Sequence, residues 1–335
     1  MMKTYKLIFS MILIMSSIIS ISAYSWLGMW IGLEINLLSI IPIIINKNIL
    51  SSESSIKYFI IQSLGSTLIL TSVIMLIWKT NFYSNMLINY SFMLIMNSSL
   101  LLKMGMAPLH FWFPEVLEGL NWFNCTIMLT WQKIAPMMLM MYNSKSIMFY
   151  SIIIICSMII STMMSFNQMS LRKLMAFSSI NHMGWMMASM LLEKMIWMIY
   201  FLIYTVITIT ITFSLKNIFF LNQLFLINES KQTKFLFMLN FLSLGGIPPF
   251  LGFLPKWLVI QMLIELNLFM LSLTMILFTL IMIFIYLRIS MSTFLIKINQ
   301  PSWKISFMYK NNELFMSMIN FFSILSLILV TILMS

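Results

Sequence analysis

The sequence predicts an all-α protein that crosses a membrane many times. Of its 335 residues, 61% are hydrophobic and only 8% are charged, whereas soluble globular proteins carry roughly 25% charged residues. Apolar runs long enough for a transmembrane helix, about 18 residues or more, recur from one end of the chain to the other. Strands of a membrane barrel would instead alternate apolar and polar residues. We therefore expect a single transmembrane domain over residues 1–335.

We expect about eleven helices, because the apolar runs are separated by short polar or charged clusters. The first run resembles a signal peptide. It has no small-residue cleavage site and leads directly into a second apolar run, so we interpret it as a retained helix. The expected ranges are 7–23, 26–46, 56–78, 86–118, 121–142, 147–164, 171–192, 195–220, 235–265, 267–293 and 313–334.

Two of these ranges, 86–118 and 235–265, are too long for one straight span, and both contain Gly and Pro. Their central segments read LLLKMGMAPLHFWFPE and LSLGGIPPFLGFLPKWLVIQ, with Lys103 and Lys256 beside the interruptions. A broken helix exposes backbone polar groups, which the membrane interior tolerates only where protein or water satisfies them. Two broken helices in corresponding halves of a chain indicate an inverted-repeat transporter with its site near the midplane.

The basic residues predict the orientation of the chain. Most Lys and Arg outside the expected spans fall on the face of the N-terminus. By the positive-inside rule, this face is the matrix or cytoplasm, and an odd number of spans places the C-terminus opposite. The formal net charge of +11 is thus explained by topology. Nucleic-acid binding is disfavoured because no aromatic and basic surface accompanies the charges.

Charged residues deep within the expected spans are the main candidates for function: Glu34, Lys103, Lys133 and Lys256. A lysine at the centre of a span costs about 2.5–3.5 kcal/mol to insert, and such residues usually mark an ion or proton path. Removal from water also favours the neutral form of an amine, so these lysines are candidates to release protons. The alternatives are a structural ion pair at Glu34 and lysines that extend towards the membrane surface.

The 2 histidines, His110 in the first interruption and His182 in FSSINHMGWMM, are candidate members of a proton relay, because histidine exchanges protons near neutral pH. Each could equally be a structural residue with a satisfied hydrogen bond. The 2 cysteines are not paired in the sequence, and the chain contains no CxxC, GxGxxG, Walker or HExxH motif. We therefore expect no metal, nucleotide or redox cofactor in this chain.

Several segments, in the same order along the chain, resemble the chain 2 family of mitochondrial NADH:ubiquinone oxidoreductase, respiratory complex I. They are SWLGMWIGLEINLLSIIP, LLLKMGMAPLHFWFPEV, LTWQKIAP, LRKLMAFSSINHMGW and LSLGGIPPFLGFLPKW. The Met- and Ile-rich composition is similar to arthropod versions. The resemblance implies an antiporter-like fold in the mitochondrial inner membrane, with the N-terminus in the matrix and the C-terminus in the intermembrane space.

The resemblance also implies a proton-translocating subunit in which Glu34, Lys103, Lys133 and Lys256 form the relay. NADH, FMN, iron–sulfur clusters and ubiquinone would bind to partner subunits, and the partners would be other membrane-arm chains, including antiporter-like ones, and lipids. A stand-alone sodium/proton antiporter with the same residues is one alternative, and a structural scaffold that moves no proton is another. A quinone-binding role is disfavoured, because no polar pair is placed for the headgroup.

Overall fold

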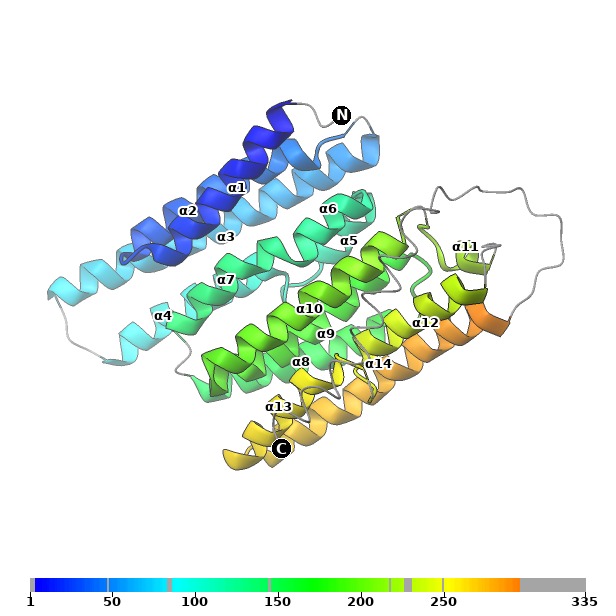
Figure 1. The fold of residues 1–335 in the computed structure, drawn as a ribbon. Coiled ribbons are helices and arrows are strands. Elements are labelled where there is room, and N and C mark those ends of the chain that lie inside the picture. Colours follow the sequence, from blue (N-terminus) through cyan, green and yellow to red (C-terminus); the bar gives the residue numbers. More distant parts are fainter. Residues whose placement is uncertain are drawn as a thin grey trace. The chain divides into compact units, whose positions relative to one another are not determined.

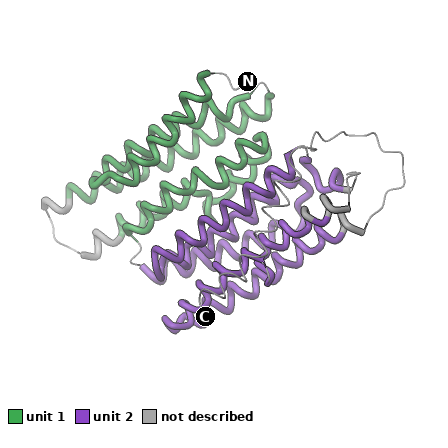
Figure 2. Tube along the Cα trace, in the orientation of Figure 1, with its two compact units in different colours: residues 1–145 green, residues 146–335 purple. Residues whose placement is uncertain are grey.

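A computed structural model describes residues 4–46, 48–82, 86–143, 146–216, 218–225, 231–248 and 250–295. The last expected helix, 313–334, lies outside the described residues. The chain forms two compact units, residues 1–145 and residues 146–335, which are coloured separately in Figure 2. We refer to them as unit 1 and unit 2 and describe each by itself.

The described residues are almost entirely helical, as Figure 1 shows, and their one β-type contact is an isolated bridge between Ser170 and Phe220. The predicted all-α class is therefore confirmed. Among the described residues, 6 helices are long and apolar enough to cross a membrane. Their apolar stretches are Thr4–Ser22, Trp26–Ile44, Ile49–Trp78, Ile147–Ser165, Lys194–Ser214 and Phe269–Met291.

Unit 1 contains α1 (Thr4–Ser22), α2 (Trp26–Ile44), α3 (Ile49–Phe82), α4 (Met86–Met104), α5 (Trp112–Gly119), α6 (Trp122–Leu129) and α7 (Trp131–Tyr142). Helices α1 and α2 pack closely because Gly32 has no side chain: a Cβ there would lie 2.7 Å from the Ser20 nitrogen. The Ser25 hydroxyl accepts a bond from the Gly28 amide at 3.2 Å and caps the start of α2. Helix α3 contacts α2, α4 and α5, so it is central to the packing of unit 1.

Unit 2 contains α8 (Ile147–Ser165), α9 (Leu171–Leu192), α10 (Lys194–Ser214), α11 (Leu221–Phe225), α12 (Lys231–Gly245), α13 (Phe253–Glu265) and α14 (Phe269–Leu295). Helix α9 contacts α8, α10, α13 and α14, and every residue from Leu174 to Met190 is buried. Burial on all sides allows α9 to carry Ser, Asn and His residues, because neighbouring helices rather than lipid surround them.

Some expected helix boundaries are wrong. The range 121–142 is two helices, with Thr130 between them at φ −114° and ψ −72°. Pro136 lacks the amide that would bond the carbonyl of Gln132, which weakens the first turn of α7. The Thr130 hydroxyl and the Thr130 amide both donate to the Thr126 carbonyl, at 2.7 and 3.0 Å.

The expected range 195–220 is also interrupted. Helix α10 ends at Ser214, because the following backbone pairs with the residues before α9. The Leu171 amide donates to the Phe219 carbonyl, and the Leu221 amide donates to the Met169 carbonyl, both at 3.0 Å. Helix α3 extends beyond the expected 56–78 in both directions. The expected bounds were set by the polar residues at each end of the apolar run. Such residues show where a helix leaves the apolar layer, but helical hydrogen bonding can continue through them.

Candidate functional site

The end of α4 places Lys103 in unit 1. The backbone leaves the helix at Gly105, whose φ of +70° is accessible mainly to glycine. The Gly105 amide donates to the Leu102 carbonyl and the Met106 amide donates to the Leu101 carbonyl, both at 3.1 Å. This pair of bonds is a Schellman-type helix end. Lys103 therefore occupies the last turn of α4, and its side chain is only 7% exposed.

Side chains from other helices also bond carbonyls at the end of α4. Trp112 Nε1 donates to the Leu102 carbonyl at 3.1 Å, and Gln62 Nε2 donates to the Lys103 carbonyl at 3.0 Å. Such bonds replace water where a helix ends in an apolar environment. The backbone around Lys103 is thus held in place by α3 and α5.

Two small cavities of unit 1, each with a volume of about 10 Å³, have Lys103, Tyr58 and Gln132 in their walls. This volume is close to the smallest that holds one water molecule. The first cavity is completed by Leu33, Asn36, Leu37, Gln62 and Pro136. The second is completed by Met104, Trp112, Phe113, Met128 and Lys133. Lys103 and Lys133 therefore line one cavity together.

A chain of hydrogen bonds fixes the wall that the two cavities share. Gln132 Nε2 donates to Asn36 Oδ1 at 2.8 Å, and the Tyr58 hydroxyl donates to Gln132 Oε1 at 3.3 Å. Both atoms of the Gln132 amide are thus engaged, so its orientation is defined. This junction joins α2, α3 and α7 beside Lys103.

Glu34 is half-buried on α2 and is the acidic group whose charge acts on Lys103. Among the described residues, no salt bridge joins these two, whereas Lys57 makes short ion pairs with Glu53 and Glu115. The structure thus brings Glu34 and Lys103 into electrostatic interaction while leaving them out of direct contact. A pair in this arrangement can be strengthened or weakened by a modest movement of either helix.

Lys133 lies in the first turn of α7 and is 1% exposed. Its Nζ atom is 5.4 Å from the centre of the Phe113 ring, a distance at which an ammonium group is attracted to the face of an aromatic ring. Phe113 follows the interruption after α4 and also lines the cavity shared by Lys103 and Lys133.

His110 does not join this group. It is buried, but Nδ1 lies 3.2 Å from the Pro108 carbonyl within the same loop, and its ring packs on Phe111. His110 also lines neither cavity. The contacts given for His110 thus lie within its own loop, and its place in a relay stays a prediction.

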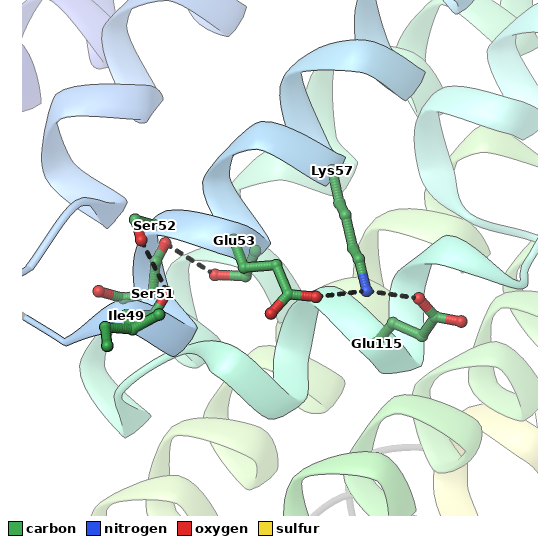
Figure 3. A network of polar contacts seen from close by, with 7 residues as sticks. Ile49, Ser51, Ser52, Glu53, Lys57 and Glu115 are labelled. Atoms are coloured by element: carbon green, nitrogen blue, oxygen red, sulfur yellow. Dashed lines mark hydrogen bonds and ion pairs between the residues drawn. The ribbon is translucent and has the colours of Figure 1, made fainter.

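The exposed charges of unit 1 form a separate network. Figure 3 shows Lys57 between Glu53 and Glu115, at 3.0 and 3.1 Å. Glu115 is thus paired with α3 rather than directed at the buried lysines. The network connects α5 to the first turns of α3 at the protein surface.

In unit 2, Lys256 lies on α13, the helix that follows the break, and not on the helix that ends there. Gly246 has φ +75°, and its amide donates to the Leu242 and Ser243 carbonyls at 3.1 Å. Lys256, 7% exposed on α13, donates from Nζ to the Gly245 carbonyl at 2.7 Å. The same atom lies 5.9 Å from the centre of the Trp185 ring. The ammonium group therefore satisfies a backbone carbonyl at the end of α12.

His182 lies on the buried face of α9, next to a group of tyrosines. Its Nδ1 is 2.9 Å from the Tyr200 hydroxyl, and its ring centre is 5.2 Å from that of Tyr204. Tyr204 also hydrogen-bonds Ser179, and Tyr286 of α14 hydrogen-bonds Ser178. All these side chains are buried, so α9 carries a row of paired polar groups.

Sequence reasoning identified the buried charges but missed the uncharged groups near the candidate residues, Asn36, Tyr58, Gln62 and Tyr200, and the two tyrosines that bond serines of α9, Tyr204 and Tyr286. A signal for two of them is present, because Tyr200 and Tyr204 are four residues apart and so lie on one helix face. In the described part of the chain, no three His, Cys, Asp or Glu residues come together in a way that could hold a metal ion.

The chain matches a known family over most of its length. The transmembrane family described as NADH:quinone oxidoreductase/Mrp antiporter matches residues 23–283. The chain belongs to this family. It is 47% identical to NADH-ubiquinone oxidoreductase chain 2 of Anopheles gambiae over 338 residues, covering 99% of this chain and 98% of the relative. It is 48% identical to the same chain of Locusta migratoria, covering 89% of this chain and 88% of the relative. The predicted resemblance is therefore confirmed.

Solved structures support the same fold. A chain of respiratory complex I from Thermus thermophilus matches with a TM-score of 0.82 at 18% identity, covering 98% of this chain and 77% of that one. A chain of the Mrp complex from Dietzia sp. matches with a TM-score of 0.78 at 15% identity, covering 86% and 60%. At these identities the likeness concerns the fold alone.

Proposed function

We propose that this chain is a proton-translocating membrane-arm subunit of mitochondrial NADH:ubiquinone oxidoreductase. Its near-full-length similarity to curated chain 2 proteins supports membership of that complex. In this proposal the chain lies in the mitochondrial inner membrane, with the N-terminus in the matrix and the C-terminus in the intermembrane space. It binds other membrane-arm subunits, while partner subunits hold NADH, FMN, the iron–sulfur clusters and ubiquinone.

One observation carries the proposal: Lys103 and Lys133 line the same small cavity. Glu34 adds an opposite charge that acts on Lys103. A carboxylate near an ammonium group favours its charged form, whereas removal from water favours the neutral form. Movement of Glu34 towards Lys103 would therefore retain a proton there, and movement away would release it towards Lys133. The protein supplies the proton sites, and the energy comes from electron transfer in partner subunits.

We further propose that the proton continues from Lys133 through His182 to Lys256. In this proposal residues 1–335 act as one antiporter-like domain. The helix ends at Gly105 and Gly246 would be the two breaks of an inverted-repeat fold of about eleven spans. The energy scale is adequate: moving one charge against the membrane potential costs about 2.3 kcal/mol per 100 mV. A change of a few units in proton affinity, each about 1.4 kcal/mol, would supply it.

The substitution Lys103→Met tests the proposal. Methionine keeps the apolar stem but cannot hold a proton, so we expect an assembled complex with impaired coupled turnover and fewer protons moved per NADH. The complex should be reconstituted in vesicles, with proton movement followed by a pH-sensitive dye. Lys57→Met is the matched control, because Lys57 lies in the same unit but is exposed and paired. A normal proton yield in Lys103→Met would overturn the relay.

The alternative functions make different predictions. A stand-alone sodium/proton antiporter would exchange the two ions in vesicles without partner subunits. A structural scaffold would be affected by neutral substitution of the buried lysines only through assembly. Migration of the chain in a large NADH dehydrogenase band on a native gel would separate the first alternative from the proposal, and the Lys103 variant would separate the second.

A further inference from the structure

Helix α9 carries three hydrogen-bonded pairs with tyrosines, and one pair differs from the other two. The pairs are Ser178 with Tyr286, Ser179 with Tyr204, and His182 with Tyr200. Helices α9 and α10 are consecutive, joined at Glu193, and Tyr200 and Tyr204 lie one turn apart on α10. The pairs with His182 and Ser179 are therefore successive cross-links between two adjacent helices.

The two serine pairs have a fixed direction. The Ser178 hydroxyl donates to the Met175 carbonyl at 2.8 Å, and the Ser179 hydroxyl donates to the Ala176 carbonyl at 2.7 Å. A hydroxyl has a single hydrogen to donate, and in each serine that hydrogen is directed at a backbone carbonyl. These pairs end in backbone carbonyls, which do not titrate, and their role is to hold the helices together.

The His182 pair has no such fixed direction. A tyrosine hydroxyl can donate to an unprotonated ring nitrogen, or it can rotate and accept from a protonated one. With Nδ1 and the hydroxyl 2.9 Å apart, the bond exists in either state. A ring that changes charge in a buried place needs a partner of this kind, because a group that only donates or only accepts would be unsatisfied in one state.

We propose that Tyr200 is the positioning residue for His182, holding the imidazole through Nδ1 in both of its charge states. This inference rests on the proposed function, in which His182 passes protons. The Tyr200 hydroxyl is bonded to His182 and is not itself a member of the proposed relay, so it acts through the imidazole. Without the hydroxyl, the ring would lose its fixed orientation and proton transfer would slow.

The test compares Tyr200→Phe with Tyr204→Phe in the complete complex, reconstituted in vesicles. Both variants remove one buried hydroxyl from the same face of α10, and only the first removes the partner of His182 Nδ1. We expect Tyr200→Phe to lower coupled turnover several-fold with the amount of assembled complex unchanged. Tyr204→Phe should leave coupled turnover near the original value, because it removes a bond to a serine, which does not titrate.

A double-mutant cycle with His182→Met separates positioning from packing. If Tyr200 acts through His182, the double variant should be no worse than His182→Met alone. Additive losses would overturn the inference, as would a loss in His182→Met without one in Tyr200→Phe. Normal coupled turnover in His182→Met would also overturn the inference about Tyr200. The proposed function in proton translocation is tested separately by Lys103→Met.

Discussion

Units 1 and 2 each place a buried lysine beside a helix end with a left-handed glycine, yet they surround it with different chemistry. In unit 1 the partners around Lys103 are the amides of Asn36, Gln62 and Gln132 with one phenol, and two small cavities adjoin them. In unit 2 the Lys256 ammonium group bonds a backbone carbonyl directly, and hydroxyls and an imidazole lie along the neighbouring α9.

This difference has a chemical meaning. A side-chain amide donates and accepts hydrogen bonds, but it does not titrate near neutral pH, so the amides of unit 1 can orient water and charge without carrying a proton. Hydroxyl and imidazole groups can reverse their hydrogen bonds. In the proposed relay, unit 1 would therefore control when a lysine holds its proton, while unit 2 contains groups suited to passing one on.

Substitutions of Gly105 and Gly246 should have the largest effects on assembly. At Gly246, an alanine Cβ would lie 2.9 Å from Lys256 Cδ and 3.0 Å from its Nζ, whereas at Gly105 it would lie 2.8 Å from Phe113 Cβ. Each also incurs about 1–2 kcal/mol of backbone strain in the left-handed region. We expect both variants to assemble poorly. Gly246→Ala should in addition lower the protons moved per NADH in whatever complex forms, because it displaces the lysine itself.

Gly245→Ala is the control for that prediction. Gly245 has no positive φ, and an alanine Cβ at this position would lie an ordinary 3.4 Å from its nearest neighbour, Ile283 Cγ1. Assembly and proton yield should stay close to those of the unchanged chain. Equal losses in Gly245→Ala and Gly246→Ala would show that the left-handed conformation and the contact with Lys256 are not the cause.

Replacing the amide junction of unit 1 should have an intermediate effect. Gln132→Leu removes the partner of both Asn36 and Tyr58, and leaving a buried polar group unsatisfied costs about 1–3 kcal/mol. We expect a lower thermal midpoint for the purified complex and slower coupled turnover, since both cavities beside Lys103 lose a fixed wall.

Tyr58→Phe provides the graded control for this prediction. It removes only the 3.3 Å bond to Gln132 and leaves the 2.8 Å bond between Gln132 and Asn36. Its effect should be smaller than that of Gln132→Leu in both measurements. Unchanged coupled turnover in Gln132→Leu would mean that the amide junction has no part in the relay.

The smallest effect is expected at the exposed network of Figure 3. Lys57→Gln removes both ion pairs, but the side chains of Lys57 and Glu115 are 42% and 57% exposed, and exposed ion pairs contribute little to stability. Coupled turnover of the reconstituted complex should be unchanged. A several-fold loss would show that the attachment of α5 to α3 by these ion pairs affects the buried site.

The sequence by itself determined the class of the protein and the most unusual residues in it. Long apolar runs require helices, because a backbone in lipid must satisfy its own hydrogen bonds. Buried Glu34, Lys103, Lys133 and Lys256 were identifiable because charge is costly in such runs. The glycines at the ends of α4 and α12 were also recognisable as interruptions, since a glycine–proline segment cannot continue a straight helix.

Only the tertiary structure decided which groups meet. It separated α6 from α7, tied His110 into its own loop and paired Glu115 with Lys57. It also brought Tyr200 to His182 from the next helix, and Gln132 to Asn36 from a helix far away in the sequence. The four-residue spacing of Tyr200 and Tyr204 places them on one helix face, but the sequence does not say which residue each one meets, because that depends on how the helices pack.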